Sequence, residues 1–232
     1  MAIAGLLGAF LGMAIFYRSA GFLGFANVQF AAVKTKPSES PTPPVSSDAW
    51  QRAVVESGLS AVAVQTFQDA VLVRSGSGLI VSSDGLIVVP VDVVPAGPYV
   101  YQVISADRII RAAVVARDYA RNLALIRFDA SNLTVGNLET GTTYQVGQEF
   151  ILTGKLVAIS KPTMFAQRTT FAYQVGDIPI LDGTPNAYLA GAQALTGDGG
   201  IAGIVYIRFG RIYLITADVI DAFLKNYLSI PS

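Results

Sequence analysis

An uncharged and strongly apolar run opens the chain. Residues 2–17 read AIAGLLGAFLGMAIFY, and the first charged side chain is that of Arg18. A helix that spans the hydrocarbon core of a bilayer needs about 20 predominantly apolar residues, and roughly 17 suffice at the low end. We therefore expect a retained membrane anchor with its interfacial flank over residues 1–25. A cleaved signal peptide and a peripheral helix are the alternatives.

The basic residues that follow this run bear on its orientation. Arg18, Lys34 and Lys36 all lie on its carboxyl side, and the positive-inside rule would keep them in the cytoplasm. A long folded domain can override a bias of so few charges. We expect a single-pass membrane protein with an extracytoplasmic globular domain, and the opposite orientation stays open.

A proline-rich segment separates the anchor from the remainder of the chain. Residues 34–48 read KTKPSESPTPPVSSD, a composition dominated by proline, serine and threonine. Proline fixes φ and removes a backbone donor, so such a segment forms an extended, semi-rigid linker. We assign a tether to residues 26–47 and a globular domain to residues 48–232.

Short runs rich in Val, Ile, Tyr and Phe dominate the globular part. Turns that contain glycine or proline separate many of them, and Ser83-Asp84-Gly85 is a hairpin signal. The repeated short spacing is typical of closed barrels or a sandwich, so the predicted fold class is all-β. The expected strands cover residues 61–67, 71–74, 78–82, 86–89, 99–105, 109–116, 123–128, 149–153, 156–160, 170–175, 202–209 and 211–215.

Two helices are expected at the ends of this domain. Ser47-Asp48 can cap a helix over residues 49–57, which Gly58 would end. The terminal segment TADVIDAFLKNYL predicts a second helix, with Thr216 as its cap. Its apolar side chains form one stripe: Val219, Ile220, Phe223, Leu224, Tyr227 and Leu228.

The residue types that are missing exclude several kinds of chemistry. The 232 residues include no cysteine and no histidine. A disulfide, a thiolate nucleophile and an iron–sulfur site are therefore excluded, and so are mechanisms of the Ser-His-Asp, Cys-His and HExxH types. The 16 basic and 16 acidic side chains give no net charge that would attract nucleic acid. We expect no cofactor, no metal ion and no nucleic-acid partner.

Six segments over roughly residues 50–228 share an order and spacing with a known family. They are AVVESGLSAVAVQTF, SGSGLIVSSDGLIVVPVDVV, RDYARNLALIRFD, YQVGQEFILTG, TGDGGIAGIVY and the terminal helix. Together they resemble the HtrA-like (Deg) branch of the trypsin-like serine peptidases. The resemblance implies two antiparallel six-stranded barrels with a cleft between them, and no PDZ-like domain is expected after them.

The resemblance also implies where a catalytic triad would lie. The family's histidine precedes two valines at a strand end, and Asp92 takes that place before Val93-Val94. The family's aspartate precedes a leucine-alanine pair, where this chain has Asn122. The nucleophile segment reads Gly-Asn-Ser-Gly-Gly-Pro, and TGDGGI is the nearest string, with Asp198 at the serine. With all three positions changed, we expect a pseudoprotease rather than an enzyme.

Two functional hypotheses follow. The first is a binding or structural subunit of a membrane assembly or homo-oligomer, whose partner is a protein or an extended peptide held partly by strand addition. Its candidate cleft residues are Thr196, Gly197, Asp198, Gly199 and Gly200. The alternative uses Asp92 and Asp198 as a close carboxylate pair that activates water or holds a hard cation such as calcium.

Overall fold

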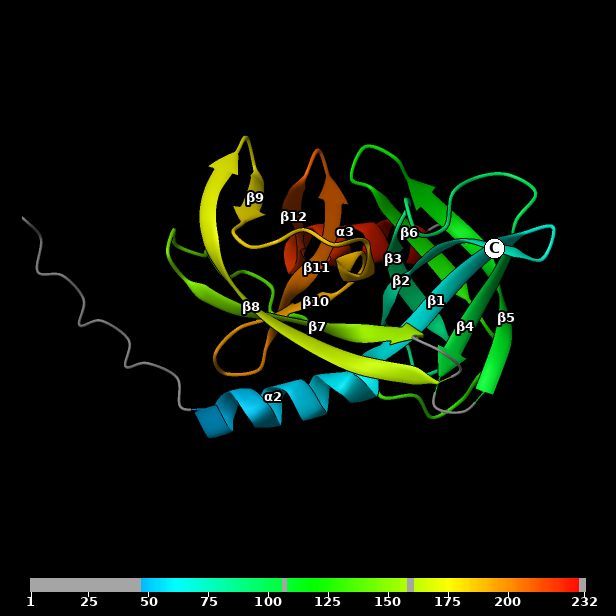
Figure 1. Ribbon diagram of the computed structural model, residues 1–232, viewed down its shortest axis with the longest axis horizontal. Helices are drawn as coiled ribbons and strands as arrows, with labels where there is room; N and C mark the ends of the chain where they lie inside the picture. Colours follow the sequence, from blue (N-terminus) through cyan, green and yellow to red (C-terminus); the bar gives the residue numbers. More distant parts are fainter. Residues whose placement is uncertain (1–46, 106–107, 158–160, 230–232) are drawn as a thin grey trace, which may run out of the picture. The chain divides into compact units, whose positions relative to one another are not determined.

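The computed structural model describes residues 47–105, 108–157 and 161–229 (Figure 1). The chain divides into a first unit, Met1–Pro43, and a second unit, Pro44–Ser232, and every described residue belongs to the second. The predicted anchor and nearly all of the tether lie outside the described residues. Among the helices that are described, none has both the length and the hydrophobicity to cross a bilayer.

Two closed antiparallel barrels of six strands each form the domain, which confirms the predicted fold class (Figure 1). The first has the strand order β1-β2-β3-β6-β5-β4 and the second β10-β11-β12-β9-β8-β7. The first barrel consists of β1 (Ala61–Gln68), β2 (Val71–Ile80), β3 (Leu86–Pro90), β4 (Val100–Ser105), β5 (Arg108–Asp118) and β6 (Leu123–Arg127). The second consists of β7 (Glu149–Val157), β8 (Pro162–Val175), β9 (Ile178–Leu181), β10 (Gln193–Leu195), β11 (Ile201–Arg208) and β12 (Arg211–Thr216).

Three helical segments complete the fold, and one of them corrects a prediction. They are α2 (Ser47–Ser60), the short 3-10 helix η2 (Ala187–Leu189) and α3 (Ala217–Leu228). The expectation that Gly58 ends the first helix was wrong, because α2 continues to Ser60. Gly58 is a packing residue: a side-chain carbon built on it would lie 2.3 Å from the sulfur of Met164 in β8. At α3, Thr216 is the N-cap residue but makes no side-chain capping bond.

Apolar side chains fill each barrel and also join the barrels to each other. One core lies in the first barrel and another in the second. A third cluster contains Trp50 of α2, Leu79 of β2, Ile204 of β11 and Phe223 of α3. Because this third cluster includes side chains from both barrels and both long helices, it fixes the barrels against one another and thereby shapes the cleft between them.

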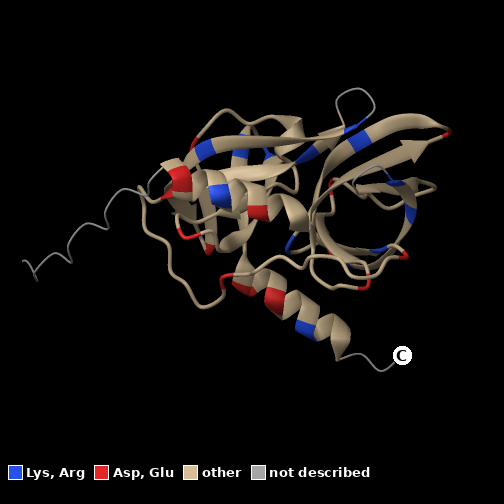
Figure 2. Cartoon of the chain, turned by 90° about the horizontal axis from the view of Figure 1, so that it is seen from below, with Lys and Arg blue, Asp and Glu red and all other residues tan. Residues whose placement is uncertain are grey.

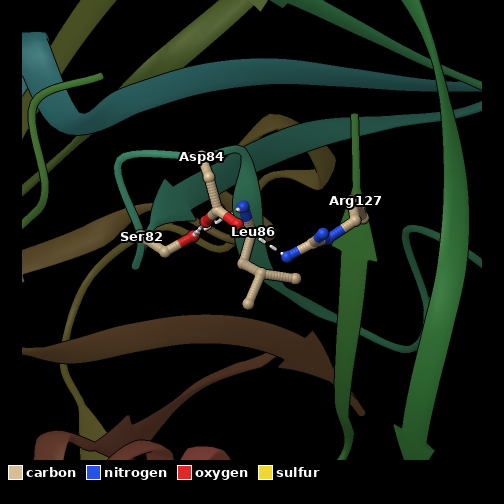
Figure 3. Close-up of polar contacts among 4 residues, drawn as sticks. All are labelled: Ser82, Asp84, Leu86 and Arg127. Atoms are coloured by element: carbon tan, nitrogen blue, oxygen red, sulfur yellow. Dashed lines mark hydrogen bonds and ion pairs between the residues drawn. The ribbon is translucent and has the colours of Figure 1, made fainter. Parts of the chain in front are cut away.

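The hairpin between β2 and β3 shows how the Asp-Gly turn predicted from the sequence is held (Figure 3). Ser82 donates its hydroxyl proton to Asp84, and the Leu86 amide donates to the Ser82 hydroxyl at 2.9 Å. Arg127 of β6 pairs with Asp84 at 2.8 Å. The hydrogen bond from Ser82 and then the charge of Arg127 lower the pKa of Asp84 from its ordinary value. The turn is therefore fastened to a strand that is distant in sequence.

Candidate peptide-binding site at the cleft

Asp92 lies in a tight turn directly after β3, and its side chain faces the solvent. The amides of Val93 and Val94 donate to the carbonyls of Pro90 and Val91 at 3.0 Å each. Val91, Val93 and Val94 are buried in the core of the first barrel. Because these three valines are buried, Asp92 is the residue of this turn that is exposed to solvent.

Asn122 lies at the start of β6 and meets Asp92 directly. Its side-chain amide donates to a carboxylate oxygen of Asp92 at 3.1 Å, and the Val91 amide donates to its backbone carbonyl at 3.1 Å. Asn122 is 9% exposed and has a φ of 56°, a left-handed conformation that asparagine tolerates better than most residues. The structure therefore brings together two of the three positions that the family resemblance singled out.

Arg117 fixes the loop that follows Asp92, a role that sequence reasoning missed. Its guanidinium donates to the carbonyls of Val94 and Pro95 and to the Tyr101 hydroxyl, at distances between 3.0 and 3.3 Å. The Tyr101 hydroxyl in turn donates to the Pro95 carbonyl at 2.5 Å. Because backbone carbonyls accept these bonds, no sequence motif marks them; their effect is to hold one wall of the cleft in place.

Asp198 lies elsewhere, in the turn between β10 and β11. Its carboxylate is 2.5 Å from the hydroxyl of Thr196, and that hydroxyl also lies 2.8 Å from a Glu139 carboxylate oxygen. Thr196 is 3% exposed and its amide donates to the Gly200 carbonyl at 2.9 Å. Burial and then the charges of Glu139, Asp218 and Asp198 raise the pKa of the nearby Tyr144.

Asp198 and Asp92 line separate hollows. This arrangement corrects the expectation that the two carboxylates face one another. One hollow, of about 670 Å³, is lined by Asp198, Gly199 and Gly200 together with the end of α2 and residues 134–140. The other, of about 500 Å³, contains Asp92. The segment 196–200 resembles the nucleophile string because Asp-Gly-Gly is a common turn sequence, and here it connects two paired strands of the second barrel.

Ala190, just before β10, also approaches the strand end that carries Asp92. It packs against the core of the first barrel, which includes Val91 and Val93. A side-chain carbon built on Gly76 would lie 2.6 Å from the Ala190 carbonyl and 2.8 Å from a methyl group of Val93. The sequence could have pointed to Ala190, because Ala190-Gly191 just before β10 is similar to the Ser-Gly pair of the family's nucleophile segment.

The backbone amides around Ala190 are occupied by local hydrogen bonds. The Leu189 amide donates to the Asn186 carbonyl at 3.0 Å, and the Ala190 amide donates to the Ala187 carbonyl at 3.2 Å. The Tyr188 amide is directed at the Asn186 side chain, 3.5 Å away. Stabilising the oxyanion of a peptide-bond reaction requires free donors aimed at the reacting oxygen. The amides of Leu189 and Ala190 instead donate to carbonyls of the η2 turn itself.

The hollow that contains Asp92 combines charged and apolar walls contributed by both barrels. Arg74 comes from β2, and Ile207 and Arg208 come from β11. The remaining lining residues are Val91, Pro95, Ala96 and Tyr119. Across residues 47–105, 108–157 and 161–229, no three acidic side chains gather in a group that could hold a metal ion. The chemistry offered by this hollow is thus hydrogen bonding, charge pairing and apolar contact.

Comparisons with known proteins agree with this architecture. No protein-family model and no curated protein matches the chain. Among solved structures, the serine endoprotease from Yersinia pestis is similar, with 21% identity and a TM-score of 0.67. The match covers 82% of this chain and 68% of that protein's chain. The chain therefore has the two-barrel fold of the trypsin-like serine peptidases.

Proposed function

We propose that this chain is a catalytically inactive, membrane-anchored homologue of trypsin-like peptidases. Its cleft binds a protein or an extended peptide, and it acts as a subunit of a membrane assembly with the globular domain extracytoplasmic. The apolar run at residues 2–17 supports the anchor. The observation that carries the proposal is the hydrogen bond between Asp92 and Asn122, because it joins two groups that cannot perform the family's proton transfer.

The chemistry of this pair argues for inactivity. In a serine peptidase a neutral imidazole takes the proton of the nucleophile, and a carboxylate stabilises the resulting imidazolium. Here an amide donates to a carboxylate, so the pair contains no imidazole, and its carboxylate has no imidazolium to stabilise. With no histidine anywhere in the chain, no other residue can supply an imidazole.

The second barrel supports the same conclusion independently. Ala190, the residue that approaches the strand end of Asp92, has no oxygen or sulfur atom that could attack a carbonyl. The amides of Leu189 and Ala190 are used within the η2 turn. These observations support the proposal that the family's base, nucleophile and oxyanion donors have been lost, and the loss of any one of them alone would already reduce catalysis strongly.

The cleft nevertheless keeps the features of a binding site. It is open, lies between two rigidly joined barrels, and combines apolar walls with a few convergent polar groups, as ligand sites commonly do. The alternative function, a carboxylate or cation site shared by Asp92 and Asp198, loses its basis because the two side chains line separate hollows.

Blocking the hollow tests the binding function. Ala96 is exposed and lines the hollow, so Ala96→Trp should fill it, whereas Ala222→Trp places the same side chain on an exposed position of α3. Full-length protein in mild detergent would be titrated with fluorescent pools of extended octapeptides. We expect saturable binding to the unmodified and Ala222→Trp proteins and at least about a tenfold loss in Ala96→Trp.

The same preparation tests inactivity and assembly. No cleavage of casein is expected, and affinity purification followed by mass spectrometry should return a stoichiometric membrane partner, or further copies of this chain, that Ala96→Trp releases. Casein cleavage that Asp92→Ala abolishes would contradict the proposal. So would partner and peptide binding that is identical in Ala96→Trp and Ala222→Trp.

A further inference from the structure

The two hollows described above differ in the sign of their charge. The hollow beside α2 is lined by the carboxylates of Glu56, Glu139 and Asp198 and by no basic residue. The hollow around Asp92 is lined by two guanidinium groups, those of Arg74 and Arg208, and by one carboxylate. Figure 2 shows the same segregation more broadly, with acidic residues recurring on the helices and most basic residues on the strands. A chain of zero net charge thus offers one acidic and one basic hollow.

Neither arginine of the basic hollow has an ionic partner within the described parts of the chain. The ion pairs there involve Arg121, Arg127 and Lys225 instead. Arg74 uses one donor on the neighbouring Val73 carbonyl at 2.8 Å, and the Arg208 guanidinium lies 5.8 Å from the centre of the Phe209 ring. Since a guanidinium carries five N–H donors, both side chains retain donors for an external acceptor.

Asp92 does not neutralise these arginines. One of its carboxylate oxygens accepts the amide of Asn122, which ties the group to the wall formed by β6. No ion pair joins Asp92 to an arginine among the described residues. Two cations against one anchored anion leave the lining of the hollow with a formal charge of +1 (2 − 1). That excess favours an anionic ligand group over a neutral or cationic one.

The surroundings of the arginines suit an extended chain. Pro95, Ala96 and Ile207 provide apolar wall. Tyr119 is 66% exposed and Phe209, next to Arg208, is 87% exposed. Aromatic and arginine side chains together are the groups that most often anchor a bound peptide.

We propose that the Asp92 hollow selects an extended peptide by one of its acidic side chains, glutamate or aspartate, which Arg74 and Arg208 hold. Planar guanidinium groups match a carboxylate in shape and donate charge-assisted hydrogen bonds to it. The acidic hollow beside α2 repels the same peptide, so the charge pattern directs the ligand to one site. This inference rests on the proposed peptide-binding function and adds the chemistry of the ligand.

Peptide pools that differ in one central residue test the inference. Octapeptides blocked at both ends and randomised over uncharged residues carry Glu, Gln or Lys at the centre, and a fourth pool carries central Gln with a free terminal carboxylate. Each is titrated against the full-length protein in mild detergent. We expect the Glu pool to bind about tenfold more tightly than the Gln pool, and the Lys pool to bind more weakly still.

Matched arginine variants assign the preference to the hollow. Arg74→Gln/Arg208→Gln should reduce the Glu-over-Gln preference to less than about twofold, and higher salt should weaken it in the unmodified protein. Arg52→Gln, on an exposed position of α2, removes a charge away from the hollow and should leave the preference unchanged. Circular dichroism verifies that each variant is folded.

The outcomes separate this inference from the function on which it rests. Equal binding of the Glu and Gln pools, with both lost in Ala96→Trp, overturns the acidic preference but keeps peptide binding. A Glu preference that survives in the double arginine variant overturns the role of these residues. Preference for the pool with a free terminus assigns the carboxylate to a chain end and overturns the side-chain assignment. Failure of every pool to bind overturns both proposals.

Discussion

At the scale of single residues, the cleft depends on backbone positions that only small residues can occupy. Gly191 follows Ala190 with a φ of 80°, and a side-chain carbon built on it would lie 1.8 Å from the Ser77 carbonyl. The Ser77 amide also donates to the Ala190 carbonyl at 2.8 Å. The second barrel therefore touches the first through backbone atoms at this point. Sequence reasoning singled out Asp92 and Asn122, which the structure brings together, whereas Asp198 lines a different hollow.

Substituting Gly191 should therefore lower the stability far more than substituting a glycine that also has a positive φ but lies in open surroundings. Gly191→Ala combines a positive φ with a backbone overlap, and we expect it to reduce the free energy of unfolding by about 3 kcal/mol or more. Gly210→Ala, with a φ of 67° and no atom within 4 Å of the added carbon, should cost only about 1 kcal/mol. Urea unfolding measures both. Equal losses in the two variants would show that the close approach at Gly191 has no energetic weight.

At the scale of elements, the prediction divided one long strand and missed two short ones. The expected strands at residues 71–74 and 78–82 form the single strand β2, because Ser75 to Ser77 continue its pairing with β1. β9 and β10 were not predicted. β10 has only three residues, and all three are buried because it pairs on both sides, so it shows no alternation. Periodicity needs both length and one solvated face, and this strand has neither.

A side-chain hydroxyl links one strand of each barrel, and its removal should be costly. Ser77 of β2 is fully buried; its hydroxyl donates to the Lys155 carbonyl and accepts from the Lys155 amide of β7, both at 3.0 Å. Ser77→Ala leaves these two backbone groups without that partner, and we expect a loss of about 2 kcal/mol in the free energy of unfolding.

Ser75→Ala is the control for this link, because Ser75 lies two residues away in the same strand and is only half-buried. It should change the stability by less than about 0.5 kcal/mol. Hydrogen exchange at the Lys155 amide, followed by nuclear magnetic resonance, provides a second readout. Unchanged protection of that amide in Ser77→Ala would mean that the hydroxyl does not hold the barrels together.

At the scale of the whole molecule, the two-barrel fold is compatible with the loss of catalysis that we propose. The two barrels share a joint core, and Asp92, Asn122 and Ala190 all lie on segments that connect their strands. The exposed Asp92 can change without disturbing the core, because its buried neighbours Val91 and Val93 fill the core instead. The inert centre that we propose can therefore coexist with a shaped hollow in one fold.

Restoring the three side chains of a triad should therefore not restore a peptidase. The variant Asp92→His/Asn122→Asp/Ala190→Ser supplies a base, its partner and a hydroxyl. The Ala190 amide still donates to the Ala187 carbonyl, so a tetrahedral intermediate would lack at least that donor. Losing a single such donor costs about 100-fold or more in rate. We expect hydrolysis of casein and of fluorogenic peptides to stay at least that far below the rate of an active two-barrel serine peptidase assayed in parallel. A variant that matched the active enzyme would show that the η2 turn rearranges on substrate binding, and the inactivity that we propose would then rest on the side chains alone.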